Sequence, residues 1–156
     1  MRLPKIFATA TVLSLLVSSP SLADTFAQTT EVVSLSGSMA DAEKVRNWLS
    51  GASFAFLDNG TFIYDLPPGT RRDWFPLRGQ WEYSGRGETI SFWGQTTTNY
   101  GASSSGVVIR GTFAGNQIRM QTISGVNLSQ CSLGYCSTSR NSSNYSSILN
   151  VSQSSR

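Results

Sequence analysis

Histidine is absent from this sequence, and cysteine and charged residues are scarce. The 156 residues include no His, two Cys, 12 Lys plus Arg and nine Asp plus Glu. Without histidine the chain has no imidazole general base, no His-based triad and no His-ligated metal site. Two cysteines cannot form a four-thiolate zinc site. We therefore expect no metal and no cofactor, and many ordinary enzyme mechanisms are excluded.

The first 23 residues have the composition of a leader. Basic residues within positions 1–5 precede an apolar run over 6–17, and small residues lead up to Ala23. This pattern predicts a signal peptide, residues 1–23, cleaved between Ala23 and Asp24. The apolar run is shorter than the roughly 20 residues that cross a bilayer, so we expect no transmembrane anchor. The sequence thus predicts a secreted or periplasmic protein.

Removal of this leader changes the charge balance. The leader carries two basic residues and no acidic one, so the chain that remains has ten basic and nine acidic side chains and a net charge of +1. Nucleic-acid binding depends on clustered Lys and Arg that neutralise phosphates. We therefore do not expect a nucleic acid among the partners.

The two cysteines, Cys131 and Cys136, enclose four residues. In an oxidising compartment such a pair is expected to form a disulfide. The spacing is not Cys-x-x-Cys, and no basic residue lies between the two to lower a thiol pKa, which favours a structural bond over a redox-active pair.

Short segments rich in aromatic and β-branched residues dominate the rest of the chain, and turn signals separate them. The clearest signal is Asn59-Gly60, which joins 53–58 to 60–66 as a hairpin. Four aromatic side chains fall on one alternating face of this hairpin: Phe54, Phe56, Phe62 and Tyr64. Aromatic pairs across strands stabilise sheets, so we expect this face to pack in the core.

Eight segments are predicted as strands: 29–35, 53–58, 60–66, 79–83, 88–93, 106–113, 117–124 and 148–153. In the hairpin of 106–113 and 117–124, alternation predicts that Arg110 and Arg119 face outward and that the inward set is Val107, Ile109, Ile118 and Met120. A short helix is predicted near 40–50, with Ser38 and Asp41 at its start and an apolar stripe of Ala42, Val45, Trp48 and Leu49. The polar stretch 94–105 is predicted as a loop. Of the 20 residues in 137–156, 14 are Ser, Thr, Asn or Gln, which is poor material for a core, so 148–153 is expected as a last edge strand at most.

Short strands joined by tight turns predict an all-β fold. We expect an antiparallel up-and-down β-barrel of about eight strands over residues 24–136, with one short helix near its N-terminus. A β-sandwich of the same strands is the alternative, since periodicity alone does not separate the two.

Three runs of residues carry a resemblance to a known family. They are Phe56-Leu57-Asp58-Asn59-Gly60-Thr61-Phe62, then Gly79-Gln80-Trp81-Glu82-Tyr83, then Ile90-Ser91-Phe92. Over residues 53–124 the chain resembles small secreted bacterial lipocalin-like domains of the calycin type. The resemblance implies an up-and-down barrel that binds a small apolar molecule or serves as a packing module.

Five carboxylates are the candidates for acid and base catalysis: Asp58, Asp65, Asp73, Glu82 and Glu88. A hydrolase of the glycosidase type needs two carboxylates held across a bond, and nothing in the sequence brings two of them together. We therefore expect no enzyme activity, and a carboxylate-dependent hydrolase is the alternative.

Four aromatic residues in predicted loops or at the end of a predicted strand are the candidates for ligand binding. Trp74 and Phe75 lie on the loop 67–77, and Trp93 or Tyr100 is expected opposite them. At the mouth of a barrel these side chains would form the rim of a site for a small apolar ligand. Alternatively, they form an exposed platform for a glycan or a partner protein. A third possibility is that Trp74 and Phe75 fold back over the core.

Overall fold

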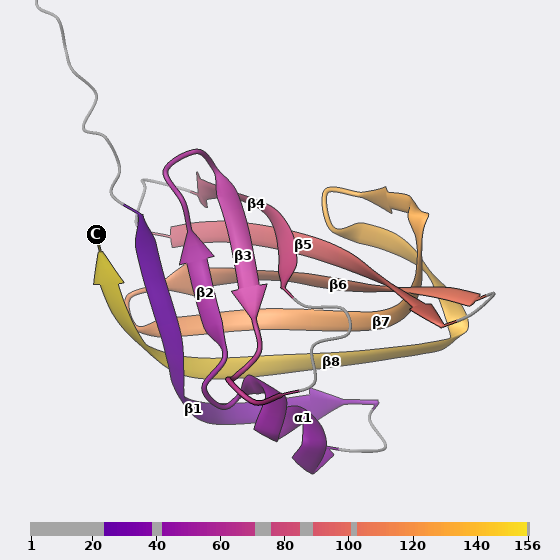
Figure 1. Ribbon diagram of the computed structural model, residues 1–156, viewed down its shortest axis with the longest axis horizontal. Helices are drawn as coiled ribbons and strands as arrows, with labels where there is room; N and C mark the ends of the chain where they lie inside the picture. The colour runs from indigo at the N-terminus through magenta and orange to yellow at the C-terminus, as the bar shows by residue number, and fades with distance from the viewer. Residues whose placement is uncertain (1–23, 39–41, 71–75, 85–88, 101–102, 156) are drawn as a thin grey trace, which may run out of the picture.

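Eight antiparallel strands close into a barrel in the computed structural model, which describes residues 24–38, 42–70, 76–84, 89–100 and 103–155 (Figure 1). In chain order the elements are β1 (Thr25–Gly37), α1 (Ala42–Leu49), β2 (Ser53–Phe56), β3 (Thr61–Asp65), β4 (Leu77–Ser84), β5 (Thr89–Tyr100), β6 (Ser103–Ala114), β7 (Gln117–Ser132) and β8 (Tyr135–Ser155). Each strand pairs with the next, and β8 pairs with β1. The predicted up-and-down barrel with one short helix is confirmed, and the sandwich alternative is wrong.

Aromatic side chains fill the interior of the barrel. Phe54, Phe56, Phe62 and Tyr64 are all buried, as their alternation predicts. The ring centroid of Phe62 lies 4.6 Å from that of Phe92 and 5.5 Å from that of Phe56. The predicted aromatic face is therefore the centre of the core.

The turn at Asn59-Gly60 sets the register of this hairpin. Gly60 has a φ of +79°, in the left-handed region that glycine adopts without a Cβ penalty. The Asn59 side chain accepts a hydrogen bond of 2.9 Å from the Thr61 amide. Phe56 then pairs with Phe62, so both rings point inward.

Helix α1 packs beside β1 (Figure 1). Val45 and Leu49, four residues apart, are buried in the barrel core, and Trp48 packs against it. Arg46, on the same helix, donates a hydrogen bond of 2.9 Å from Nη1 to the Val32 carbonyl oxygen of β1. The predicted apolar stripe holds for these three residues, whereas Ala42, in the first turn, is exposed.

The polar stretch 94–105 is not a loop as predicted. β5 runs on to Tyr100 and β6 begins at Ser103, and the two strands pair continuously from Ile90↔Phe113 to Tyr100↔Ser103. Hydrogen bonding between the two backbones does not require apolar side chains, which is why a Ser- and Thr-rich sequence can extend a hairpin.

Strand β8 is also longer than the sequence predicts. The expected edge strand at 148–153 is the last part of a strand that pairs with β1 on one side and β7 on the other, so it is not an edge. Only alternate residues of β8 have to face inward. Ser147, Leu149 and Val151 fill those positions, whereas Ser146, Ile148 and Asn150, which alternate with them, lie on the outward face.

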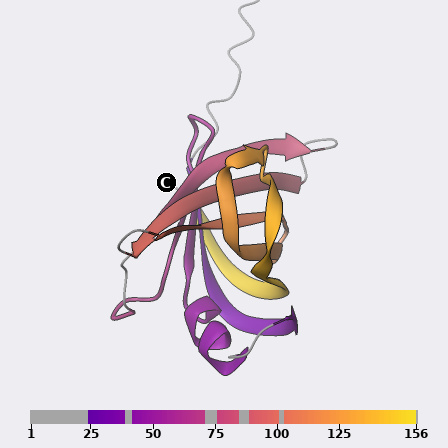
Figure 2. The same ribbon diagram turned by 90° about the vertical axis from the view of Figure 1, so that its right-hand side faces the viewer.

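Beyond the barrel, β7 and β8 continue as a hairpin that we call the arm, residues 127–137. Their pairing is shifted between Ser124↔Ser143 and Val126↔Thr138, and the arm turns there. Figures 1 and 2 show it folded back over the barrel wall. Val108, Ile123 and Val126, on the outside of the barrel, are buried against Leu128, Cys131 and Cys136. A second small core thus holds the arm in place.

Candidate binding groove

The arm ends in a two-residue turn. Ser132 pairs with Tyr135, which leaves Leu133 and Gly134 as the turn, with φ angles of +50° and +78°. Two positive φ angles are typical of the type I′ turns that hairpins favour. For Leu133 this conformation costs roughly 1 kcal/mol, because its Cβ crowds the backbone. The side chain of Leu133 is nevertheless 70% exposed, so the tip presents an apolar group to solvent.

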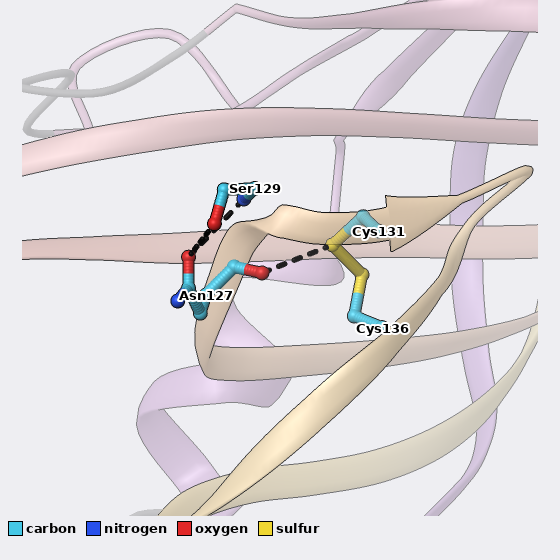
Figure 3. Close-up of a disulfide and its surroundings, with 4 residues drawn as sticks. All are labelled: Asn127, Ser129, Cys131 and Cys136. Atoms are coloured by element: carbon cyan, nitrogen blue, oxygen red, sulfur yellow. Dashed lines mark hydrogen bonds between the residues drawn. A yellow bond between two sulfur atoms is a disulfide. The ribbon is translucent and has the colours of Figure 1, made fainter.

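The predicted disulfide between Cys131 and Cys136 is confirmed and closes the arm behind this turn (Figure 3). The two Cα atoms are 4.0 Å apart. In the part of β7 that precedes Cys131, the Asn127 side-chain oxygen accepts hydrogen bonds from the amide and the hydroxyl of Ser129, at 3.1 and 2.8 Å. The arm is therefore shaped by local bonds.

Replacing both cysteines by serine is expected to lower the free energy of unfolding by about 2 kcal/mol, because the closed loop is short. The barrel core does not contain the disulfide, so the variant should still fold. Amide hydrogen exchange over 127–137 should become faster, while exchange in β5 and β6 stays slow. Loss of the barrel's own protection in the variant would contradict the assignment of the bond to the arm alone.

Outward side chains from β4 to β8 form two rows across the barrel wall. Cross-strand partners lie side by side on one face of a sheet, so the register defines the rows. The first row is Glu82, Ser91, Thr112, Arg119 and Ile148. The second row is Gln80, Trp93, Arg110, Gln121 and Ser146. All of these except Gln80 line a single groove with a volume of about 890 Å³.

The tip of the arm forms one wall of this groove. A Cβ atom added at Gly134 would lie 3.0 Å from the Trp93 Cβ and 3.7 Å from the Arg110 Cβ, so the turn rests directly on the second row. Tyr135 places its ring against the Arg110 guanidinium, with 4.3 Å between the guanidinium carbon and the ring centroid. Leu133 and Tyr135 both line the groove. Glycine is favoured here because a Cβ would crowd Trp93 and because the φ of +78° is one that other residues rarely adopt.

Arg110 is held in place from two directions. Its Nε–H donates a hydrogen bond of 2.8 Å to the Gln121 side-chain oxygen, and the Gln121 amide nitrogen donates one of 3.0 Å to Asn144. Tyr135 packs on the face of the guanidinium. Neither partner is an anion, so the positive charge of Arg110 is oriented without being neutralised by these contacts.

The residues predicted to bind ligand are only partly described. Trp93 lies in the groove, half-buried and on the outer face of β5. The backbone of Tyr100 belongs to the end of the same strand. Trp74 and Phe75 lie outside the described residues, so the expected rim of Trp74, Phe75, Trp93 and Tyr100 stays a prediction.

Of the residues that line the groove, the sequence predicts only Trp93 as ligand-binding; Arg110, Arg119, Gln121 and Tyr135 are among those it misses. The alternation in 106–113 and 117–124 does predict that Arg110 and Arg119 face outward, and the structure confirms it. The signal for Tyr135 is its place between two bonded cysteines, since a short closed loop presents its side chains on a rigid frame. No local pattern indicates that this loop folds back onto β5 and β6.

The described carboxylates among the five candidates lie at separate places. Asp58 lies in the turn between β2 and β3, Asp65 ends β3 with its side chain accepting a hydrogen bond from the Leu66 amide, and Glu82 lines the groove. Asp73 and Glu88 lie outside the described residues. None of the three described carboxylates therefore faces another across a common cleft.

Two tyrosines of the interior have shifted acidities. Burial raises the pKa of Tyr64 far above its usual range, with smaller contributions from Tyr145 and Asp65. Burial also raises the pKa of Tyr145. Both phenols therefore remain protonated at neutral pH. Desolvation in a packed core explains both shifts, so they indicate no acid or base chemistry.

Within the described part of the chain, no three His, Cys, Asp or Glu side chains gather as a metal site would require. The same residues include no helix with the length and apolar character needed to cross a membrane. Comparison of the chain with protein-family models, with characterised proteins and with solved structures finds no match.

Proposed function

We propose that this chain is an extracytoplasmic binding protein without enzymatic activity, and that its ligand occupies the groove between the barrel wall and the arm. The observation that carries the proposal is the position of Trp93. Its indole lies on the outer face of the barrel, beside an arm tip held by a disulfide, in a groove of about 890 Å³. Ligand sites are typically concave surfaces of this size, with a few placed polar groups.

The lining of the groove favours a saccharide. Trp93 and Tyr135 supply broad aromatic faces, and each loses little conformational entropy on binding. Around them Ser91, Thr112 and Gln121 offer hydroxyl and amide groups that both donate and accept hydrogen bonds. A sugar ring has an apolar face and a rim of hydroxyls, which matches this combination.

Two features support the extracytoplasmic location. The leader pattern of residues 1–23 predicts export. The disulfide between Cys131 and Cys136 is compatible with an oxidising compartment, where such bonds persist.

The competing hypothesis is the lipocalin-like one, in which a small apolar ligand enters the barrel mouth beside Trp74 and Phe75. Described side chains in the interior pack closely: Phe56, for example, has ring contacts with Phe62, Phe92 and Phe113 at about 5.5 Å. A site there would have to lie above this packed layer. We therefore favour the groove.

Tryptophan fluorescence separates the two sites. We expect oligosaccharides to change the emission of the wild type and of the W48F and W74F variants, and to leave the emission of the W93F variant unchanged. Among the tryptophans that the structure describes, Trp93 alone lines the groove. Trp48 is the matched control, since it lies on α1 and packs against the core. Trp93→Ala should weaken saccharide binding by about tenfold, the loss expected for one aromatic contact.

The reverse pattern would contradict the groove. A response to the hydrophobic probe anilinonaphthalene sulfonate that disappears in W74F, together with silence toward saccharides, would support the barrel mouth instead. If neither probe changes the emission, the proposed saccharide site is wrong, and a pull-down from the same compartment would then test a protein partner.

A further inference from the structure

We propose that the saccharide bound in the groove carries an acidic group, a carboxylate or a sulfate, and that Arg110 and Arg119 recognise it. The inference rests on the proposed function, since it names the chemical class of the ligand at the same site. It depends on how the two arginines lie in the groove and on which charges surround them.

The guanidinium of Arg110 is oriented by its neighbours in a way that suits the binding of an anion. Its Nε–H is used by Gln121 and one face of the guanidinium lies on Tyr135, at 2.8 and 4.3 Å respectively. The remaining N–H groups of the guanidinium are at the Nη atoms, and Arg110 lines the groove. A guanidinium binds a carboxylate or sulfate through two parallel hydrogen bonds, and an orientation fixed in advance lowers the entropic cost of forming them.

Arg119 lies diagonally across from Arg110. Arg110 pairs with Gln121 between β6 and β7, and Arg119 is two residues from Gln121 on the same face. Diagonal neighbours on one face of a sheet are about 7–8 Å apart, within the combined reach of two long side chains. Arg119 is exposed and lines the groove. Two guanidinium groups can therefore approach one anionic group from neighbouring strands.

The negative charge of the groove lies on its opposite side. Glu82 is on β4, at the far end of the row that contains Arg119 on β7. Three strand spacings separate them, roughly 14 Å. At that distance across solvent the attraction is largely screened. The groove thus has a cationic part on β6 and β7, although the chain without its leader has almost no net charge.

The groove also has the length of an extended ligand. It follows the curved wall from Glu82 on β4 to Ile148 on β8, a path of four strand spacings or roughly 19 Å along the surface. A free inorganic anion would occupy only the part beside the arginines. An acidic oligosaccharide would place its charged group there and its neighbouring rings against Trp93.

Calorimetric titration of the full chain with matched saccharides tests the inference. The ligands are an oligogalacturonate, the same oligosaccharide as its neutral methyl ester, and a dextran sulfate oligosaccharide, which carries sulfates and no carboxylate. We expect at least one acidic ligand to bind about tenfold more tightly than the neutral ester, because charge-assisted hydrogen bonds are lost in the ester. The acidic ligand that binds more tightly shows whether the site recognises a carboxylate or a sulfate.

Arginine variants locate the anion site. R110Q and R119Q should each weaken binding of the acidic ligand by about tenfold or more and leave binding of the neutral ester unchanged. Arg78→Gln is the matched control, because Arg78 is an exposed arginine of β4 that does not line the groove. Equal melting temperatures for the variants would exclude misfolding as the cause.

Each other outcome identifies what failed. If the ester and the acid bind equally, and Trp93→Ala weakens both, the acidic ligand class is wrong and the saccharide site stands. If R78Q weakens binding as much as R110Q, the attraction is general and the specific site is overturned. If no saccharide binds at all, the proposed function itself is wrong.

Discussion

Truncation of Phe62 to alanine is expected to lower the free energy of unfolding by about 3–5 kcal/mol. Phe62 is fully buried, and its ring contacts those of Phe54, Phe56 and Phe92 with centroids 6.4, 5.5 and 4.6 Å away. These neighbours are on β2 and β5 of a closed barrel, so they cannot easily move to fill the cavity. The loss is a large part of the stability of a domain of this size. Urea unfolding followed by circular dichroism measures it.

Val33→Ala is the matched control for this measurement. Val33 lies on β1 and is 48% exposed, so the same kind of truncation should change stability by no more than about 0.5 kcal/mol. A loss of less than about 1 kcal/mol for Phe62→Ala would show that the interior is loosely filled. That result would also favour a ligand inside the barrel over one in the groove.

Alanine at Gly79 is expected to destabilise the protein by at least about 3 kcal/mol, through overlap rather than through a cavity. Gly79 pairs with Gly94 between β4 and β5. A Cβ added at Gly79 would lie 2.6 Å from the Trp93 carbonyl carbon and closer still to the Trp93 oxygen and the Gly94 Cα. These are backbone atoms, so relief requires the two strands to separate.

Gly115→Ala provides the comparison. Gly115 lies in the β6–β7 turn with a φ of +59°, and a Cβ there would meet no atom within 4 Å. The cost should therefore be the backbone strain alone, about 1–2 kcal/mol. Thermal unfolding of both variants tests the difference. Equal losses at Gly79 and Gly115 would mean that the approach of β4 to β5 is not close.

The core and the strand order follow from patterns that operate over a few residues. Alternation predicts that Phe54, Phe56, Phe62 and Tyr64 share one face, and Asn59-Gly60 predicts their turn, because each signal depends only on local chain geometry. The inward set of 106–113 and 117–124 is predicted for the same reason: Val107, Ile109, Ile118 and Met120 are all buried. Antiparallel neighbours along the chain then lead to the barrel.

Strand lengths are harder to predict than strand positions. β5 beyond Trp93 and β8 before Ile148 consist largely of Ser, Thr, Asn and Gln. Their propensity signals are weak, and what makes them strands is a neighbouring strand already in place to accept backbone hydrogen bonds. That information belongs to the tertiary structure.

The groove depends on register, which is why its composition is the least predictable part. Trp93, Arg110 and Gln121 are far apart in the sequence and become neighbours only because β5, β6 and β7 pair in one alignment. A shift of one residue would turn each of these side chains inward. Likewise, Val108 stands in the sequence as one more residue of an apolar run. It lies on the outer face of β6 and is buried because the arm covers it, so both faces of β6 are buried there.

Closure of the barrel through β1 and β8 has a consequence for how the chain reaches this state. Thr25 pairs with Ser155, so the last ladder joins segments at opposite ends of the described chain. Such high contact order slows folding, because loop-closure entropy has to be overcome before the contacts form. A chain crossing a membrane amino end first would expose the edges of β1 and β7 until β8 emerged, and unpaired edges promote aggregation. Chaperones that bind the unfolded chain on the far side of that membrane should therefore raise the yield of folded protein.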